Sequence, residues 1–334
     1  MSEFTEKVLA SINEAKAKIE QIRKEDSLVF PIFTDLHTED VGHEYSERLL
    51  SALELIKNSF DYDALIDLGD NFSMLGRDIH ITNDELESRF VRVLSAIYEA
   101  QGKPIINVNG NHDAPGTDFF KPDFWNRIVK WKYGNNTAVY DDCGAYYYID
   151  YEKADTRLVV LSLPCDSDIE AEMPTPIWGF GEKQLKWLKD TALDTNKNVI
   201  ILSHVPFYDK YTGDMEATLG VWTGEVEKVS YISALCGWIE DLDQAVEIIE
   251  EKAGKKLVAV LSGHTHLDDL FMPYEEKNGS KNPLPCPQVV TTATCFTEGK
   301  ELEIGISIDV AVWTPSKREL NMIRIGDGED RRVL

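Results

Sequence analysis

Five short apolar segments of this chain are each followed, within three residues, by aspartate, asparagine or histidine. The first three alternate with stretches of helical periodicity, in the order strand, helix, strand, helix, strand. This order is typical of parallel strands joined by helical crossovers. Parallel strands present their carboxyl ends along one edge of a sheet, where α/β proteins form their ligand sites. The sequence therefore predicts an α/β fold that gathers polar side chains at one edge.

The predicted strands are 28–33, 64–68, 105–108, 146–151, 158–163, 199–202, 257–261 and 289–293, and the predicted helices are 3–24, 44–58, 83–101, 181–192 and 240–253. The tail differs, because apolar residues alternate over 304–312, a turn follows at 314–316 and an apolar segment resumes at 320–325. This pattern predicts an antiparallel hairpin and hence a mixed sheet system. Pro31 cannot donate to a strand ladder, so we expect the early half of its strand to lie at an edge or to carry a bulge.

A single domain is expected over residues 1–334, because no Gly/Ser linker, long charge block or internal repeat divides the chain. It begins with an amphipathic helix at 3–24, which we expect to dock by its apolar stripe. Two segments are interpreted as loop insertions: 114–144, rich in aromatic residues, and 207–238, rich in glycine and tryptophan. Long connections near a site often form its walls or lid.

The charge balance restricts the partners of the chain. Lysine and arginine number 34 against 59 aspartates and glutamates, a net charge of −25, and no basic block is present. This composition disfavours duplex nucleic acid and anionic membrane surfaces as partners. No apolar run approaches the roughly 20 residues that span a bilayer, and the first residues do not resemble a secretory signal, so we expect a cytoplasmic protein.

The five cysteines are odd in number and widely spaced, so we expect reduced packing residues rather than disulfides or a thiolate zinc site. Five of the seven histidines stand just after apolar segments, whereas His43 and His80 lie in polar surroundings and are expected at the surface.

The polar residues at the strand ends form recognisable short motifs. In Asp35-Leu36-His37, an extended backbone would direct the aspartate and the histidine to the same side. The other motifs are Gly69-Asp70, Gly110-Asn111-His112-Asp113, an isolated His204 and Gly263-His264-Thr265-His266, in which the two imidazoles share the same spacing. Each motif taken singly is also compatible with ordinary turn or capping chemistry.

Together the motifs supply oxygen and imidazole donors and no thiolate. The candidate ligands are Asp35, His37, Asp70, Asn111, His204, His264 and His266. Seven ligands exceed the four of a closed structural zinc site and suit two divalent ions that share a bridge. Asp70 is the natural bridge, because its two carboxylate oxygens lie between the earlier and the later ligands in the chain.

The order of these motifs resembles the calcineurin-like metallophosphoesterase superfamily, whose pattern is Asp-x-His, Gly-Asp, Gly-Asn-His-(Asp/Glu), an isolated His and Gly-His-x-His. The resemblance implies a four-layered α/β sandwich of two mixed β-sheets flanked by helices. It also implies one metal ion held by Asp35, His37, Asp70 and His266, and a second held by Asp70, Asn111, His204 and His264. The donor types admit Mn, Fe, Zn, Co or Ni.

The resemblance also implies a mechanism of phosphate-ester hydrolysis. Two divalent ions, offset by Asp35, Asp70 and a bridging hydroxide, leave roughly +1 to hold a phosphate group. The ions would activate the hydroxide for in-line attack on phosphorus. His112 is then available to donate a proton to the leaving oxygen, and Asp113 is a candidate to orient His112.

One departure from the family narrows the expected substrate. Phosphoprotein phosphatases of this superfamily carry an Asp-Arg pair shortly after Gly-Asp, whereas 71–74 here reads Asn-Phe-Ser-Met, and Arg77 is expected to be solvated. We therefore expect a phosphoesterase for a small phosphorylated molecule, with a phosphodiesterase for cyclic nucleotides or related diesters as the alternative. A non-catalytic metal-binding scaffold is the alternative of another class, and the intact ligand set with His112 argues against it. The sequence does not indicate an oligomeric state.

Overall fold

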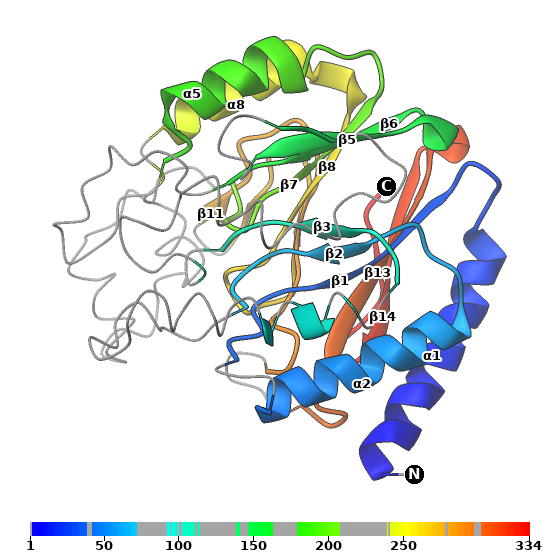
Figure 1. Ribbon diagram of the computed structural model, residues 1–334. Helices are drawn as coiled ribbons and strands as arrows, with labels where there is room; N and C mark the ends of the chain where they lie inside the picture. Colours follow the sequence, from blue (N-terminus) through cyan, green and yellow to red (C-terminus); the bar gives the residue numbers. More distant parts are fainter. Residues whose placement is uncertain are drawn as a thin grey trace, which may run out of the picture.

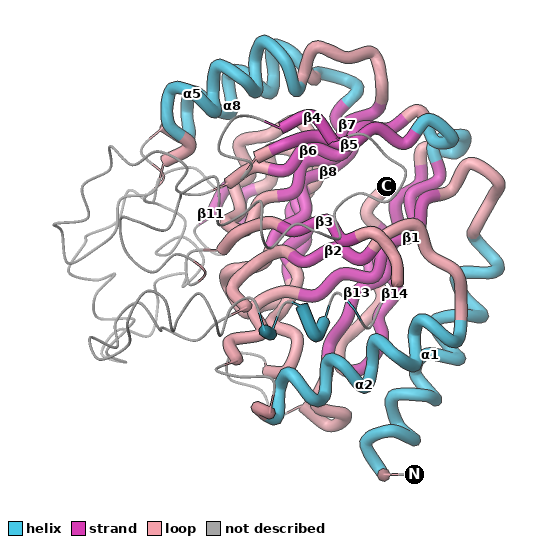
Figure 2. Tube along the Cα trace, viewed as in Figure 1, coloured by secondary structure: helices cyan, strands magenta, loops and turns pink. Residues whose placement is uncertain are grey.

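The computed structural model of the chain describes residues 2–38, 42–71, 92–93, 95–97, 99, 102–110, 113, 138–140, 146–162, 179–207, 239, 241–277, 280–296 and 302–334. Two mixed β-sheets lie face to face in this part of the chain, and helices cover the outer face of each sheet (Figure 1). The layers are clearest when the chain is coloured by secondary structure, because the strands lie between two helical layers (Figure 2). The four-layered α/β sandwich predicted from the sequence is confirmed.

The first sheet is built from six strands: β1 (Leu28–Phe33), β2 (Leu65–Asp67), β3 (Ile105–Asn107), β13 (Ser307–Thr314), β14 (Glu319–Gly326) and β15 (Arg331–Arg332). Their order in the sheet is β15-β14-β13-β1-β2-β3. β1, β2 and β3 run parallel, as the βαβαβ pattern predicts. β13 and β14 form the predicted antiparallel hairpin, and β13 also pairs antiparallel with β1.

The second sheet is built from seven strands: β4 (Ala138–Tyr140), β5 (Tyr147–Tyr151), β6 (Thr156–Val160), β7 (Asn198–Leu202), β8 (Leu257–Ser262), β9 (Asp269–Phe271) and β12 (Gln288–Val290). Their order is β4-β5-β6-β7-β8-β12-β9, and the central strands β6, β7, β8 and β12 are parallel. β10 (Glu276–Lys277) and β11 (Ser280–Lys281) pair as a separate small hairpin.

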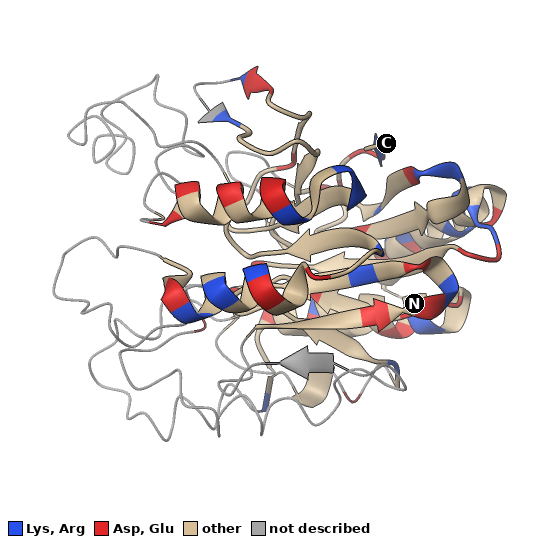
Figure 3. Ribbon diagram, turned by 90° about the horizontal axis from the view of Figure 1, so that it is seen from above, with Lys and Arg blue, Asp and Glu red and all other residues tan. Residues whose placement is uncertain are grey.

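Helices α1 (Glu3–Ile22) and α2 (Glu44–Ser59) cover the first sheet. The second sheet is covered by α8 (Leu242–Lys252) and by α5 (Gly181–Trp187), which continues as the π-helical turn η4 (Leu188–Ala192). Short 3₁₀ turns complete the described elements: η3 (Glu152–Ala154), η5 (Gly254–Lys256) and η6 (Pro315–Lys317). Charged residues concentrate on the helices and loops, while most strand residues are uncharged (Figure 3). Within the described residues, no helix is both long and apolar enough to cross a membrane.

Three apolar clusters separate the four layers, and α1 shows how sequence pattern produces them. The helix begins at Ser2, whose Oγ accepts the Thr5 N–H at 3.2 Å, so one otherwise unpaired N–H at the helix start is satisfied. Its buried stripe comprises Val8, Ile12, Ala15 and Ile19. This stripe packs in one cluster with the residues of β13 and β14 that face α1 and α2. The opposite face of β13 contributes to the cluster between the sheets, so β13 is buried on both sides.

The early half of β1, which contains Pro31, pairs with β13 on one side only, so the edge expected for this half is confirmed. As a whole, β1 lies inside the sheet between β13 and β2. Val29 and Phe33, which have the same parity as Pro31, bond toward the β2 side: Val29 exchanges bonds with Asp63, and the Phe33 carbonyl accepts from Leu68. The missing N–H of Pro31 therefore faces away from β13. Pairing with β2 begins only at Ile32, so the ladder loses no bond there.

Other predictions are tested only in part. Cys286 and Cys295 are buried free thiols, as expected, and burial raises the pKa of Cys295 to about 12. The other three cysteines and His80 lie outside the described residues. So do the two insertions, apart from β4 in 114–144 and Phe207 in 207–238. His43, expected at the surface, is partly buried and caps α2.

Replacement of Ile12 tests whether α1 is an integral layer. Ile12→Ala should lower the free energy of unfolding by about 2 to 5 kcal/mol, because it leaves a cavity in a fully buried stripe. Glu14→Ala, on the exposed side of the same helix, should change it by less than about 0.5 kcal/mol. Chemical denaturation followed by circular dichroism measures both. Equal, small effects would mean that α1 is only loosely attached.

Candidate metal centre

The loops that follow four parallel strands meet at one end of the sandwich. In the first sheet, the loop after β1 bonds to the loop after β2 through Asp35 N to Gly69 O at 2.8 Å and His37 N to Asp70 O at 3.1 Å. In the second sheet, the loops after β7 and β8 are joined by Gly263 N to His204 O at 3.0 Å. Each sheet thus contributes two hydrogen-bonded loops to this end of the sandwich.

Two further bonds join the loops of one sheet to those of the other. The Asp35 Oδ2 atom accepts the His264 N–H at 2.9 Å. The His204 Nδ1 atom lies 2.8 Å from the Leu68 carbonyl, to which it donates. Because both bonds are buried, the site is fixed across the junction of the two sheets.

Most of the candidate ligands share an unusual backbone conformation. Positive φ angles occur at Asp35 (49°), His37 (44°), Asp70 (54°), His264 (72°) and His266 (56°). A non-glycine residue in this region costs on the order of 1 kcal/mol or more, and such residues concentrate at functional sites. The side chains therefore converge because the backbone alternates between left-handed and ordinary conformations. The extended backbone predicted for the motifs at 35–37 and 263–266 is wrong, since β1 and β8 end before them, at Phe33 and Ser262.

Glycine is required where the loops touch. A Cβ on Gly69, whose φ is +96°, would lie 2.5 Å from the Gly110 nitrogen. A Cβ on Gly110 would lie 2.1 Å from Asp70 Oδ1 and 2.3 Å from Asp70 N. A Cβ on Gly263 would lie 2.5 Å from Asp35 Oδ2. Gly110 and Gly263 thus approach buried carboxylates, and Gly69 approaches the Gly110 backbone, more closely than a side chain would allow.

One group of donor atoms is formed by Asp35, His37 and His266. The Asp35 Oδ1 atom lies 3.7 Å from His37 Nε2 and 3.4 Å from His266 Nε2, and the two imidazole nitrogens are 3.0 Å apart. The sequence prediction assigned these three residues, with Asp70, to one ion.

The second group is formed by Asp70, His204 and His264, all buried. Asp70 Oδ2 lies 3.1 Å from His204 Nε2, and His204 Nε2 lies 3.3 Å from His264 Nδ1. The same Asp70 oxygen is 3.9 Å from His37 Nε2, so Asp70 lies between the two groups, in the position of a bridge. Six of the seven predicted ligands therefore lie together, and Asn111 is outside the described residues.

These residues fit a divalent cation in each group. Asp35 Oδ1 is buried with no hydrogen-bond partner in the described part of the chain. Asp35 Oδ2, by contrast, accepts from Thr34 Oγ1 at 2.7 Å as well as from His264 N. A buried, unpaired carboxylate oxygen among imidazoles is the donor that a metal ion requires. The Leu68 carbonyl likewise holds Nδ1 of His204 and leaves Nε2 as the ligand atom.

Burial and the two carboxylates shift the pKa values of these groups in different directions. Burial disfavours the charged form of His204, but the carboxylates of Asp70 and Asp35 outweigh it and raise the pKa of His204 to about 10. Burial, with the adjacent His204, lowers the pKa of His264 to about 3. Burial opposes ionisation of Asp35, but the surrounding imidazoles hold its pKa well below the usual range. The centre thus attracts positive charge to its carboxylates.

Asp113 supports the loops rather than lining either group. Its carboxylate accepts the backbone N–H groups of Asp70 at 2.8 Å, Asn71 at 2.8 Å and Gly110 at 2.9 Å. Burial and the nearby charges of Asp70 and Asp67 raise the pKa of Asp113 to about 8. Asp113 therefore fixes the backbone that carries Asp70. The predicted partner, His112, lies outside the described residues, as does Arg77.

Sequence reasoning missed the segment after β12, which bonds to the loops after β1 and β8. Thr294 Oγ1 donates to the Thr34 carbonyl at 2.8 Å and accepts the Thr34 N–H at 3.0 Å. Thr292 Oγ1 donates to the His266 carbonyl at 2.8 Å. A run of threonines at a strand end was the available signal. Its bonding partners are distant in sequence, so the signal gave no assignment.

The family comparison agrees with the motif order. A family model described as calcineurin-like phosphoesterase matches residues 29–268, a span that contains every predicted site residue. No curated protein sequence matches the chain.

Two solved structures resemble the described fold. A dimetal phosphatase from Danio rerio aligns with a TM-score of 0.57 and 14% identity, covering 92% of this chain and 98% of the phosphatase. The structure of PhoD aligns with a TM-score of 0.51 and 12% identity, covering 92% of this chain and 68% of PhoD. At these identities the likeness concerns the fold.

Substitution of Gly110 tests whether the close approach to Asp70 is required. Gly110→Ala should reduce bound metal by at least about half, because the new Cβ displaces the Asp70 carboxylate. Gly42→Ala is the matched control, since nothing lies within 4 Å of its Cβ position. Elemental analysis, with circular dichroism to verify folding, measures the effect. A folded Gly110→Ala protein with full metal content would contradict the geometry.

Proposed function

Because the chain belongs to the calcineurin-like phosphoesterase family, we propose that it is a phosphoesterase that depends on two divalent metal ions and hydrolyses a small phosphorylated molecule. The observation that carries the proposal is the pair of donor groups that meet at Asp70. Each group combines imidazole nitrogens with carboxylate oxygen, the donor set of catalytic rather than closed structural metal sites.

The chain's own residues prepare this centre in a fixed geometry. Asp35, His37, Asp70 and His266 would hold one ion, and Asp70, His204 and His264, together with Asn111, would hold the other. When bound, the two ions supply Lewis-acid chemistry, which polarises the phosphoryl group and the attacking water. The Leu68 carbonyl, the Thr34 hydroxyl and the Asp113 carboxylate keep the ligands oriented, so little reorganisation is needed when substrate arrives.

We assign proton transfer to His112, because it is the histidine of the third motif that the proposed ligand sets leave unused. As a general acid it would protonate the leaving oxygen of the ester. The Asp113 carboxylate accepts the backbone N–H groups of Asp70 and Gly110. It would therefore hold the loops after β2 and β3 in place. Asp113 would thus act as a positioning residue, whether or not it also contacts His112.

The competing functions make different demands on the same residues. A metal-binding scaffold needs the ligands but has no use for His112. A phosphodiesterase needs all of them and differs in the substrate that it accepts. A cytoplasmic location and the absence of nucleic-acid and membrane partners stay predictions from composition.

Two substitutions separate ligand from acid. Asp70→Ala should lose both metal and activity, because it removes the carboxylate placed between the two groups. His112→Ala should retain the metal and lose activity by a factor of about 10² to 10⁴. Elemental analysis and steady-state kinetics measure the two quantities. Loss of metal from His112→Ala would contradict the assignment of this histidine.

The choice of ester sharpens this test. Nitrophenolate leaves without protonation, so His112→Ala should impair p-nitrophenyl phosphate less than an alkyl phosphate. Equal impairment would make charge stabilisation the better account of His112. Faster hydrolysis of bis-p-nitrophenyl phosphate than of the monoester would move the assignment to diesters. No hydrolysis of any ester by the metal-loaded protein would favour the scaffold.

A further inference from the structure

A row of aromatic side chains leads outward from the first donor group. The Phe296 ring packs edge-on against His266, with ring centroids 4.8 Å apart, and lies 5.7 Å from the His37 ring. Tyr45 stacks on Phe296 at 5.9 Å with an interplanar angle of 24°. His43 in turn packs edge-on against Tyr45 at 5.0 Å. We call Phe296, Tyr45 and His43 the aromatic row.

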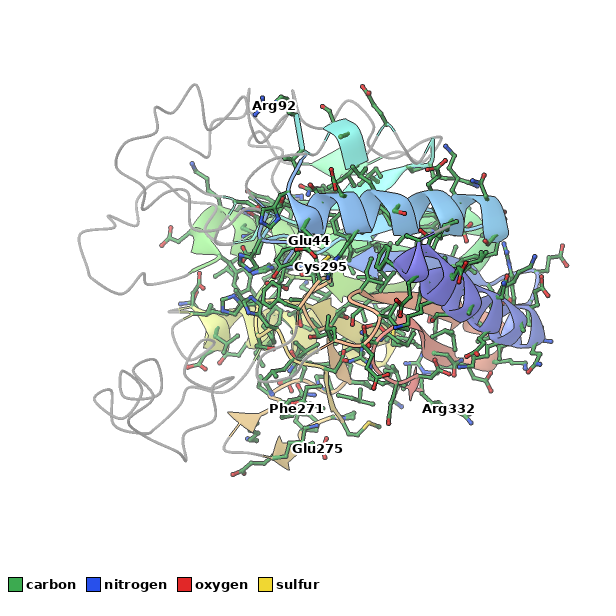
Figure 4. All side chains as sticks on the ribbon, turned by 90° about the horizontal axis from the view of Figure 1, so that it is seen from below. Glu44, Arg92, Phe271, Glu275, Cys295 and Arg332 are labelled. Carbon is green, nitrogen blue, oxygen red and sulfur yellow. The ribbon has the colours of Figure 1, made fainter. Side chains whose placement is uncertain are left out.

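Hydrogen bonds at the start of α2 hold the aromatic row in place. Tyr45 lies in the first turn of α2, where its N–H donates to Nδ1 of His43. The buried Cys295 donates through Sγ to the Tyr45 carbonyl at 3.5 Å, which ties the start of α2 to the residue before Phe296. The labelled side chains of Glu44 and Cys295 lie side by side in the view from below (Figure 4). The rings therefore have a fixed position beside the ligands.

Packing of the core does not account for Phe296. It is only partly buried, and it belongs to none of the three apolar clusters of the described residues. Phenylalanines that belong to the core, such as Phe30 and Phe33, are at most 1% exposed. Phe296 instead packs against imidazoles and against Tyr45, which is also partly exposed.

We propose that the aromatic row binds a planar ring of the substrate, so that the preferred substrates are phosphate esters carrying an aromatic heterocycle near the ester oxygen, as nucleotides do. This inference rests on the proposed function. Phe296, the first ring of the row, packs against His37 and His266 of the first donor group, so a ring carried by a phosphate ester bound at the two groups would be within reach of the row. Heterocycles stack on aromatic side chains irrespective of their hydrogen-bonding pattern, which makes such a surface a general ring site.

A matched pair of substrates isolates the ring. Nucleoside 5′-monophosphates and methyl riboside 5-phosphate share the same phosphate ester and sugar, and only the former carry a base. With saturating Mn²⁺, the wild-type protein should prefer the nucleotides in kcat/KM. Phe296→Ala should lower the ratio of the two kcat/KM values by roughly 5-fold to 100-fold, mostly through KM. Phe296→Tyr should restore most of the ratio.

Tyr274→Ala is the control variant, because this exposed aromatic residue lies on the loop after β9 and contacts Glu250. It should leave the ratio unchanged. A readout without turnover comes from saturation-transfer NMR with adenosine, which has the ring and no phosphate. Its signal should be present with the wild-type protein and with Tyr274→Ala, and should weaken strongly with Phe296→Ala.

The outcomes separate this inference from the proposed function. Equal losses for both substrates in Phe296→Ala would mean that the ring only supports the imidazoles, and the inference would be wrong. The same follows if wild-type protein hydrolyses p-nitrophenyl phosphate in an Asp70-dependent manner but does not prefer nucleotides. If the metal-loaded protein hydrolyses no ester at all, the proposed function itself fails, and the inference fails with it.

Discussion

The burial of two neighbouring carboxylates, Asp35 and Asp70, is the constraint on which the rest of this structure depends. Both are at most 1% exposed, and both sit where the ends of the two sheets meet. Unpaired buried charge costs several kcal/mol per ion, and the surrounding imidazoles offset it only where they are protonated. Positive charge must therefore be supplied at this point, and divalent cations supply it with the ligand types present. Cation binding at this site is therefore expected to stabilise the fold.

The sandwich keeps this site rigid. The left-handed backbone at five candidate ligands is strained, and a well-packed scaffold is needed to maintain it. Glycines at 69, 110 and 263 let the loops approach closely, because a Cβ there would clash. Thr294 bonds the segment after β12 to the loop after β1, and Asp113 bonds the loop after β3 to the loop after β2. The strained backbone lowers the stability of the fold but holds the ligands in a preorganised geometry. Stabilisation of charge during phosphoryl transfer requires such a geometry.

The sequence was most informative where physics is local. Strand segments, the β13–β14 hairpin and the polar strand ends follow from periodicity, and parallel strands bring such ends to one edge. The edge inferred from Pro31 holds for the early half of β1 only, because β2 pairs with this strand from Ile32 onward. The convergence of Asp35 with His37 was predicted for the wrong backbone conformation. The hydrogen bonds of Thr294 to Thr34 and of Asp113 to Asp70, and the ring contacts of Phe296, join residues distant in sequence, so no local pattern indicates them.

We propose that the two donor groups bind two ions that share Asp70. Anomalous diffraction from crystals of the full chain grown with Mn²⁺ tests this proposal most directly. Two anomalous peaks are expected, one beside Asp35, His37 and His266 and the other beside His204 and His264, with Asp70 contacting both. A single peak at full Mn²⁺ saturation, or two peaks of which only one contacts Asp70, would contradict it.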